Sequence, residues 1–338
     1  MNKSQCFIIA ELSANHNGSL DKALLLVSEA AKAGADAIKL QTYTADTITL
    51  NCDNKYFHIK NNSQWDGQSL YSLYEKAYTP WEWHQAIKDK VEDLGLVFLS
   101  TPFDFTAVDF LEDLGVSLYK IASFEVVDIP LIERVASTQK PIIMSTGMAT
   151  KDEIQEALDA IKAHGNHDVT LLKCVSNYPA KAEDLNINSM AELREHFKVK
   201  VGLSDHSLSH LPSILAVALG AVVIEKHFIL NRDDGGADCD FSLEPHEFSE
   251  MVKSIREAEE VLGSNEINPS DKLCKNRVFR KSLFISCDVK AGDYLSAQNV
   301  RSVRPSYGMS PKYYQTVLGK RFIRDLKKGT PLSFEDIE

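Results

Sequence analysis

The sequence contains no long apolar run and no excess of positive charge, and these two absences exclude broad classes of protein. No hydrophobic run reaches the roughly 18 residues that a membrane-spanning helix requires. The formal net charge of −11 would repel polyanions such as nucleic acids and anionic membrane surfaces. We therefore expect no nucleic acid and no membrane among the partners. A small anionic substrate would need a local cluster of lysines.

Closely spaced cysteines are also absent. The six cysteines stand at positions 6, 52, 174, 239, 274 and 287 and form no CxxC pair. This spacing indicates neither a zinc ribbon nor a disulfide framework, and it is typical of a reducing compartment. The short apolar run near the start is too short for the apolar core of a signal peptide. We expect a soluble, cytoplasmic protein.

Short apolar or β-branched runs alternate with longer segments of helical periodicity over most of the chain. The clearest helices are 20–33, 151–164, which begins with a capping box of Thr150 and Glu153, and 245–262. Eight strand–helix pairs predict an α/β protein with a (β/α)8 TIM barrel, and a doubly wound open sheet is the alternative. The predicted strands are 6–10, 36–41, 96–100, 117–121, 141–145, 169–175, 199–203 and 221–226.

Two regions depart from this alternation. The stretch 43–78, rich in Asn, Ser, Tyr and Asp, is too long for a plain loop and predicts a cover over a functional site. Near the C-terminus, 288–300 and 325–337 share D-x-K-x-G-x-x-L-S at a period of 37 residues, which predicts one compact module with two similar halves. We therefore expect a barrel domain over 1–263, a linker over 264–282 and a small second domain over 283–338.

Polar residues follow or end each predicted strand. Active sites of TIM barrels lie at the carboxyl ends of the strands, and residues two apart in a strand point to the same side. We therefore expect these side chains to meet at one polar mouth. They are Glu11, Lys39, Gln41, Thr101, Ser123, Glu125, Ser145, Ser176, Tyr178, Ser204, His206, Glu225 and His227.

Two histidines, His206 and His227, end adjacent strands and could reach one metal ion, to which Glu11, Glu225 or Asp238 could add oxygen ligands. Such a mixed set suits Mn²⁺, Mg²⁺ or Co²⁺ more than structural zinc. The alternative is that each histidine is a hydrogen-bonded core residue.

Two lysines, Lys39 and Lys120, point towards the same mouth, where lysine is a good partner for phosphate or carboxylate. Alternatively, both could extend to solvent. Four hydroxyl residues at strand ends would complete an anion cradle, namely Thr101, Ser123, Ser145 and Ser204.

Several motifs carry a family resemblance. AELSANHNGS (10–19), IKLQT (38–42), LSTPFD (99–104), KIASFE (120–125), MSTGM (144–148), VGLSDHS (201–207) and IEKHF (224–228) resemble motifs of the sialic acid synthase family. RPSYG and the K-x-G repeats look like that family's antifreeze-like (SAF) domain. Within the family, segments 69–84, 122–132 and 233–245 look most like the pseudaminic acid synthases.

The resemblance implies a phosphoenolpyruvate-dependent transferase that forms a C–C bond with an N-acetylated amino sugar. It also implies a homodimer in which each small domain covers the partner's barrel, with Arg304 given across the dimer. It places a divalent metal, Mn²⁺ before Mg²⁺ or Co²⁺, on His206 and His227. Phosphoenolpyruvate is then held by Lys39, Thr101, Lys120, Ser123, Ser145, Ser176 and Ser204. Glu11 and Glu125 stand beside the reacting centre, Glu225 joins the substrate-binding set, and the sugar side has Gln41, Tyr178 and Asp238.

The expected reaction makes pseudaminic acid from 2,4-diacetamido-2,4,6-trideoxy-L-altrose, and the aromatic stretch from Tyr71 to Trp83, with Phe124, predicts a less polar sugar pocket. Related alternatives are an N-acetylneuraminate or a legionaminate synthase. A Schiff-base aldolase would need a strand lysine, and Lys173 has the wrong parity to face the mouth. A non-catalytic carbohydrate-binding barrel is the alternative of another class.

Overall fold

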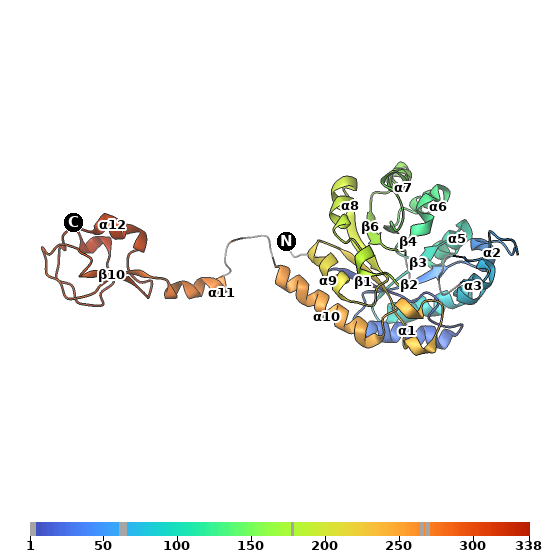
Figure 1. Cartoon of the computed structure of the whole chain (residues 1–338), viewed down its shortest axis with the longest axis horizontal. Helices are drawn as coiled ribbons and strands as arrows, with labels where there is room; N and C mark the ends of the chain where they lie inside the picture. The colour runs from blue at the N-terminus through green and yellow to red at the C-terminus, as the bar shows by residue number, and fades with distance from the viewer. Residues whose placement is uncertain (1–4, 61–65, 177–178, 264–266, 268–270) are drawn as a thin grey trace. The chain divides into compact units, whose positions relative to one another are not determined.

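The chain divides into two compact units, Met1–Gly263 and Ser264–Glu338. The computed structural model of the 338-residue chain describes residues 5–60, 66–176, 179–263, 267 and 271–338 (Figure 1). No helix in these ranges is long and apolar enough to cross a membrane.

The first unit is a closed barrel of parallel strands in the order β1 to β8. This confirms the TIM-barrel prediction and excludes the open sheet. Neighbouring registers align polar residues at the carboxyl ends, such as Glu11 with His227 and Ser204 with Glu225. The strands are β1 (Phe7–Glu11), β2 (Ala37–Thr42), β3 (Val97–Pro102), β4 (Tyr119–Ile121), β5 (Ile142–Ser145), β6 (Val169–Cys174), β7 (Lys200–Asp205) and β8 (Val223–His227).

Eight α-helices follow these strands around the barrel (Figure 1). The predicted capping box is present, because Glu153 N–H donates to Thr150 Oγ1 at 3.3 Å and Thr150 N–H donates to Glu153 Oε2 at 2.7 Å. The helices are α1 (Leu20–Lys32), α4 (His84–Asp93), α5 (Phe105–Leu114), α6 (Ile129–Ala136), α7 (Lys151–Ala163), α8 (Ser189–Phe197), α9 (Leu211–Ala218) and α10 (Pro245–Leu262).

The barrel interior is built in layers, and this layering positions the site. Its lower layer is an apolar cluster of Ile9, Ala37, Leu99, Ile143, Leu172 and Val223. Because side chains two apart along a strand share a face, the next interior positions upward include Glu11, Lys39, Thr101, Ser145 and Glu225. Polar groups therefore lie above a dry floor and are themselves buried.

The stretch predicted as a cover contains two short helices, α2 (Ala45–Ile48) and α3 (Leu70–Ala77), which contact each other. Buried hydrogen bonds attach it to the barrel at both ends. The Thr42 hydroxyl lies 2.9 Å from His84 Nε2, and Trp81 Nε1 donates to the Tyr43 carbonyl at 3.1 Å. We call residues 43–77 the cover.

The second unit has two similar halves that pair with each other. Its strands β9 (Ser282–Ile285) and β10 (Val300–Val303) are antiparallel. The two repeat copies meet where Val289 and Leu326 exchange backbone hydrogen bonds of 2.9 and 3.0 Å. Ion pairs of equivalent residues flank this contact, Lys290 with Asp325 at 2.6 Å and Asp288 with Lys327 at 2.7 Å. The apolar core of this unit includes Leu283, Ile285, Leu295, Phe322 and Leu332.

Candidate active site

A buried charge network occupies the mouth of the barrel. Lys39 Nζ, at the centre of β2, lies 2.8 Å from Glu11 Oε2 and 2.9 Å from Glu225 Oε1. Lys120 Nζ from β4 lies 3.8 Å from the same Glu225 oxygen, to which Ser204 Oγ donates at 3.1 Å. The lysine side chains are at most 5% exposed, so the alternative in which they extend to solvent is wrong.

Burial and pairing act in opposite directions on these groups. Burial lowers the pKa of Lys39 to about 8, although Glu225 favours its charged form. Burial alone would raise the pKa of Glu225, but Lys120 and then Lys39 outweigh it and hold that pKa well below its ordinary value. The mouth therefore keeps a carboxylate between two lysines, and an entering anion would share the lysine protons with it.

Three hydroxyls beside this network are buried and have no hydrogen-bond partner within the described ranges, those of Thr101, Ser145 and Ser176. A buried hydroxyl without a partner costs about 1–3 kcal/mol, so this arrangement indicates that a ligand supplies the missing bonds. Ser123 is also buried, and both Ser123 and Ser176 lie next to the backbone of Gly147.

Gly147, in the turn after β5, was not predicted as a site residue. A Cβ placed on it would lie 2.5 Å from Ser123 Cβ and 2.7 Å from Ser176 Oγ, and its φ is +41°. Only glycine fits this backbone beneath the two serines. The signal available in the sequence was the glycine of the MSTGM motif immediately after a strand.

Glu125 differs from the other carboxylates of the mouth. It lies in the 3-10 turn η2 (Ser123–Val127) after β4, and its Oε2 is buried without a hydrogen-bond partner within the described ranges. Burial raises the pKa of Glu125 to about 7, with Lys120 opposing the shift. A carboxyl group that titrates near neutral pH is suited to accept and return a proton.

The two predicted metal ligands are adjacent. His206 and His227 have ring centroids 5.2 Å apart, and Phe241 packs edge-on against both rings. His206 Nδ1 lies 2.9 Å from the Val175 carbonyl. His227 Nδ1 is buried without a hydrogen-bond partner in the described part of the chain, and Asp238 Oδ2 is 3.9 Å away.

These histidines fit a metal ion. Burial, followed by the charge of His206, holds the pKa of His227 well below its ordinary value, so its ring is neutral and can donate a lone pair. The described residues contain no group of three or more His, Cys, Asp or Glu side chains that could hold a metal. Substrate or water oxygens would therefore have to complete the coordination around the pair.

The remaining predicted residues are placed as follows. Gln41 Nε2 donates to Ser13 Oγ at 3.0 Å at the mouth, whereas Tyr178 lies outside the described residues. Arg304 belongs to the second unit, just after β10. Leu172 belongs to the interior cluster, so the adjacent Lys173 points outward from the barrel and cannot serve as a Schiff-base lysine in the mouth.

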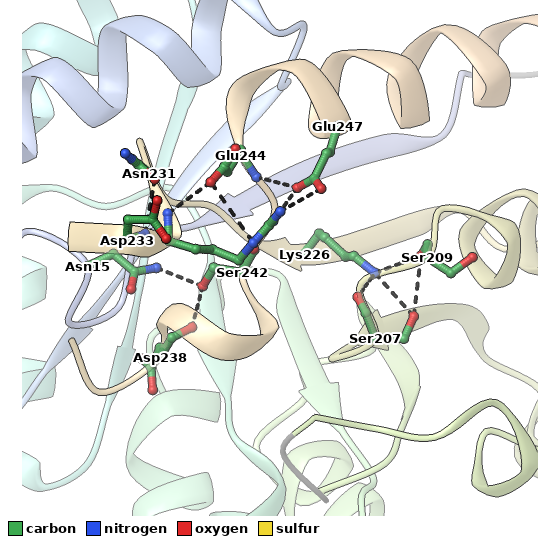
Figure 2. Close-up of polar contacts among 11 residues, drawn as sticks. Asn15, Ser207, Ser209, Lys226, Asn231, Asp233, Asp238, Ser242, Glu244 and Glu247 are labelled. Atoms are coloured by element: carbon green, nitrogen blue, oxygen red, sulfur yellow. Dashed lines mark hydrogen bonds and ion pairs between the residues drawn. The ribbon is translucent and has the colours of Figure 1, made fainter. Parts of the chain in front are cut away.

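Two polar networks that sequence reasoning missed hold the loops after β7 and β8 (Figure 2). Lys226 of β8 is fully buried and donates to Asp205 Oδ2 at 2.7 Å and to the carbonyls of Ser207 and Ser209. It thereby ties down the loop that carries His206. No sequence period marks these contacts, although Lys226 lies in the IEKHF motif.

The second network supports Asp238. Asn15 Nδ2 donates to Ser242 Oγ at 2.9 Å, and Ser242 Oγ donates to the Asp238 carbonyl at 2.6 Å (Figure 2). The segments involved are more than 200 residues apart, with a separation of 227 between Asn15 and Ser242. Spacing along the chain could not have indicated this contact.

A cavity of about 700 Å³ opens above the mouth. We call it the mouth cavity. Its floor includes Gln41, Glu125, Ser176, His227 and Asp238. Its opposite wall is formed by residues of the cover. The apolar and aromatic ones are Tyr43, Ile48, Ile59, Leu70, Leu73, Tyr74 and Ala77, and the polar ones are Lys55, His58 and Lys60. This volume is in the range of small-molecule sites.

The mouth of this closed TIM barrel buries lysines, carboxylates and hydroxyls that lack partners among the described residues. These features define a class of protein, the barrel enzymes that act on small anionic substrates. Comparison with known proteins makes the assignment specific. The NeuB family model matches residues 26–267, and the SAF domain model matches residues 280–338. The chain belongs to the NeuB family.

Individual relatives agree with this assignment. The chain is 48% identical to the pseudaminic acid synthase of Campylobacter jejuni over 98% of this chain and 96% of that protein. It is 47% identical to the pseudaminic acid synthase of Helicobacter pylori over 98% of this chain and 97% of that protein. A crystal structure of the N-acetylneuraminic acid (sialic acid) synthetase of Leptospira borgpetersenii is 32% identical and covers 81% of this chain and 90% of its own, with a TM-score of 0.72.

Proposed function

We propose that this protein catalyses the pseudaminic acid synthase reaction, which condenses phosphoenolpyruvate with 2,4-diacetamido-2,4,6-trideoxy-L-altrose and releases phosphate. The observation that carries the proposal is the buried mouth, where two lysines adjoin three hydroxyls that lack partners within the described ranges. The chain is 48% identical to a pseudaminic acid synthase, and this identity favours that reaction over those of other NeuB-family synthases.

Phosphoenolpyruvate binds in the lower part of the mouth. Lys39 and Lys120 neutralise its phosphate and carboxylate, because a lysine ammonium is a good point-charge partner for both anions. The hydroxyls of Thr101, Ser145 and Ser176 donate the hydrogen bonds that these oxygens accept. Ser123 and Ser204 complete the cradle, with Ser204 shared with Glu225.

His206 and His227 hold a divalent ion, in first place Mn²⁺, with Mg²⁺ or Co²⁺ as substitutes. Sialic acid synthases of the NeuB family are generally metal-dependent, and the neutral ring of His227 with the adjacent ring of His206 supports this assignment. When bound, the ion supplies Lewis-acid polarisation of the aldehyde oxygen and orients the sugar.

The condensation forms one C–C bond and one C–O bond, the latter to water, and breaks the C–O bond to phosphate. The methylene carbon of phosphoenolpyruvate attacks the aldehyde carbon, whose oxygen becomes a hydroxyl, and a cation develops at the neighbouring carbon. Water adds to that carbon and gives a proton to Glu125, whose pKa of about 7 suits a general base. Glu125 passes this proton to the former aldehyde oxygen, and phosphate then leaves with C–O cleavage and takes the proton of the added hydroxyl, so that a keto group remains. Glu11, held by Lys39, stabilises the cation electrostatically.

The active unit is a cytoplasmic homodimer in which Arg304 of one chain reaches the sugar's amide in the partner's barrel. The small size of the domain over 283–338 and its separate core support this assembly, since a domain of about 55 residues is close to the lower limit for independent stability. Gln41, Tyr178 and Asp238 complete the sugar side of the site.

An assay of phosphate release and product mass tests the function. With saturating phosphoenolpyruvate, the diacetamido sugar should give a far higher kcat/KM than N-acetylmannosamine, because a site that pairs a second amide strongly rejects substrates that lack it. EDTA should abolish turnover, and Mn²⁺ should restore it. Equal or better use of N-acetylmannosamine would assign the protein to the sialate branch. Full activity without metal would exclude the metal assignment.

A further inference from the structure

Helix α3 has an apolar stripe that is only half-buried in the described part of the chain. Leu70, Leu73, Tyr74 and Ala77 stand at positions i, i+3, i+4 and i+7, the spacing of one helix face. An amphipathic helix normally buries such a face in the core, yet no residue of α3 is buried. All four residues instead line the mouth cavity.

The helix has little other support on this side. A second cavity, of about 470 Å³, is lined by Leu73 and Ala77 together with Ala14 and Ala237. Leu73 therefore faces open volume on two sides. A ligand in the mouth cavity that packs against this half-buried face would complete its burial and remove apolar surface from water.

Neighbouring aromatic residues make this wall firm. Tyr43 is buried and makes edge-to-face contacts with Tyr74 and Phe103, with ring centroids 5.5 and 5.2 Å apart. Phe124, which is 61% exposed, joins the lining from the floor side.

Most of the aromatic stretch expected to form the sugar pocket does not reach it. Tyr71 donates its hydroxyl to Asp46 at 3.1 Å, Trp81 packs on Phe110, and Trp83 packs on His16. None of these three aromatic residues is among those that line the mouth cavity. Tyr74, from the same stretch, does line it.

The ends of the sugar are fixed by the chemistry. Resting on the proposed function, the aldehyde carbon must lie at the floor, near His227 and Glu125, where it meets phosphoenolpyruvate. The sixth carbon stands at the opposite end of the open chain and so reaches the wall formed by the cover. In the diacetamido trideoxy sugar this carbon is a methyl group, whereas a sialate precursor carries a hydroxyl there.

We propose that the apolar stripe of α3, centred on Leu73, is the specificity determinant that selects sugars with a methyl group at the sixth carbon. A methyl group packs on Leu70 and Leu73 without loss, whereas a hydroxyl placed against these two leucines would leave water and gain no partner from them, the Tyr74 hydroxyl being the one polar group of the stripe. An apolar pocket discriminates against an added hydroxyl by up to about 100-fold.

The test compares two sugars on matched variants. The substrates are 2,4-diacetamido-2,4,6-trideoxy-L-altrose and the analogue that keeps its hydroxyl on the sixth carbon. Leu73→Gln keeps helix propensity and introduces an amide into the stripe. It should narrow the kcat/KM ratio of the two sugars about 10-fold, chiefly by loss with the methyl sugar, and leave the KM for phosphoenolpyruvate unchanged.

Three further variants make the result interpretable. Leu50→Gln changes an exposed leucine of the cover that does not line the cavity, and it should retain the wild-type ratio. Leu73→Met should also retain it, because it keeps an apolar side chain of similar volume. Leu70→Gln should narrow the ratio as Leu73→Gln does, and it replaces that variant if the latter fails to fold.

A wild-type ratio preserved in a folded Leu73→Gln or Leu70→Gln variant overturns the inference, as does an equal change in Leu50→Gln. The proposed function has a separate test that needs no variant. It is wrong if the wild-type enzyme uses N-acetylmannosamine and not the diacetamido sugar.

Discussion

At the scale of single residues, two carboxylates of the mouth occupy opposite environments. Glu11 accepts the Ser13 N–H at 2.8 Å and pairs with Lys39, whereas Glu125 is buried with one oxygen lacking a partner in the described part of the chain. Environments that differ in this way assign acid–base work to one carboxyl group and electrostatic work to the other. The sequence showed both residues but could not distinguish their roles.

The protonation of Glu125 predicts the pH dependence of the reaction. Because its pKa is raised to about 7, the carboxylate fraction falls as the pH drops through 7, and kcat/KM should fall with it. Glu125→Gln should lose about 10²–10⁴-fold in kcat and also lose this acidic limb of the profile. Steady-state kinetics from pH 5 to 9 checks this, with Glu133→Gln on the exposed face of α6 as control. An unchanged acidic limb in Glu125→Gln would assign the titration to another group.

Gly147 offers a sharper test of the anion cradle. In Gly147→Ala the new methyl group would contact Ser123 and Ser176, so the KM for phosphoenolpyruvate should rise at least about 10-fold. Gly165→Ala is the matched control, because Gly165 also has a positive φ, of +75°, but open space around its Cβ position. Both variants share the backbone strain of about 1 kcal/mol, and the clash with the two serines should lower the melting temperature of Gly147→Ala further. Equal KM values in the two variants would contradict the cradle.

At the scale of elements, the strands and the helices between them were predictable because their periodicity is strong. Each observed strand starts and ends within two residues of its prediction, with β3 and β7 each continuing two residues further than predicted. The cover was recognised only by its length. Helix α3 is short, and its apolar face lines a cavity instead of the core. The apolar periodicity that usually indicates a core helix is therefore a weak signal over this short segment. The networks that hold the loops after β7 and β8 join distant segments and leave no local pattern.

The stability of the paired strands β7 and β8 should depend on the buried ion pair between Lys226 and Asp205. Lys226→Met would leave Asp205 buried without its cation, which typically costs about 3–5 kcal/mol of unfolding free energy. Combining it with Asp205→Leu should recover most of that loss, because no buried charge remains. Urea unfolding measures both.

Lys200→Met provides the comparison, because Lys200 lies on β7, the strand of Asp205. It breaks the exposed Lys200–Asp168 pair of 3.0 Å and should change stability by less than about 1 kcal/mol. Equal losses in Lys226→Met and Lys200→Met would show that the buried pair is not what holds the loop after β7.

At the scale of the whole molecule, the barrel and the second unit have separate apolar cores. Deleting residues 283–338 should therefore leave a folded barrel with little synthase activity. Mixing Arg304→Ala with a His227→Ala chain should restore part of the activity through hybrid dimers, provided that the subunits exchange. Phosphate release by the mixture measures this. If verified hybrids stay inactive, Arg304 does not act across the dimer.

The two halves of the second unit suggest how that unit arose. The bond from Gly292 N–H to the Phe322 carbonyl repeats as the bond from Gly329 N–H to the Ile285 carbonyl, and the Lys–Asp pairs cross in the same way. Each half thus provides the hydrogen-bond and ion-pair partners of the other half. An ancestral chain with a single copy could have satisfied these groups only against a second molecule of itself, so the present domain has the construction of a homodimer whose subunits became joined by gene duplication.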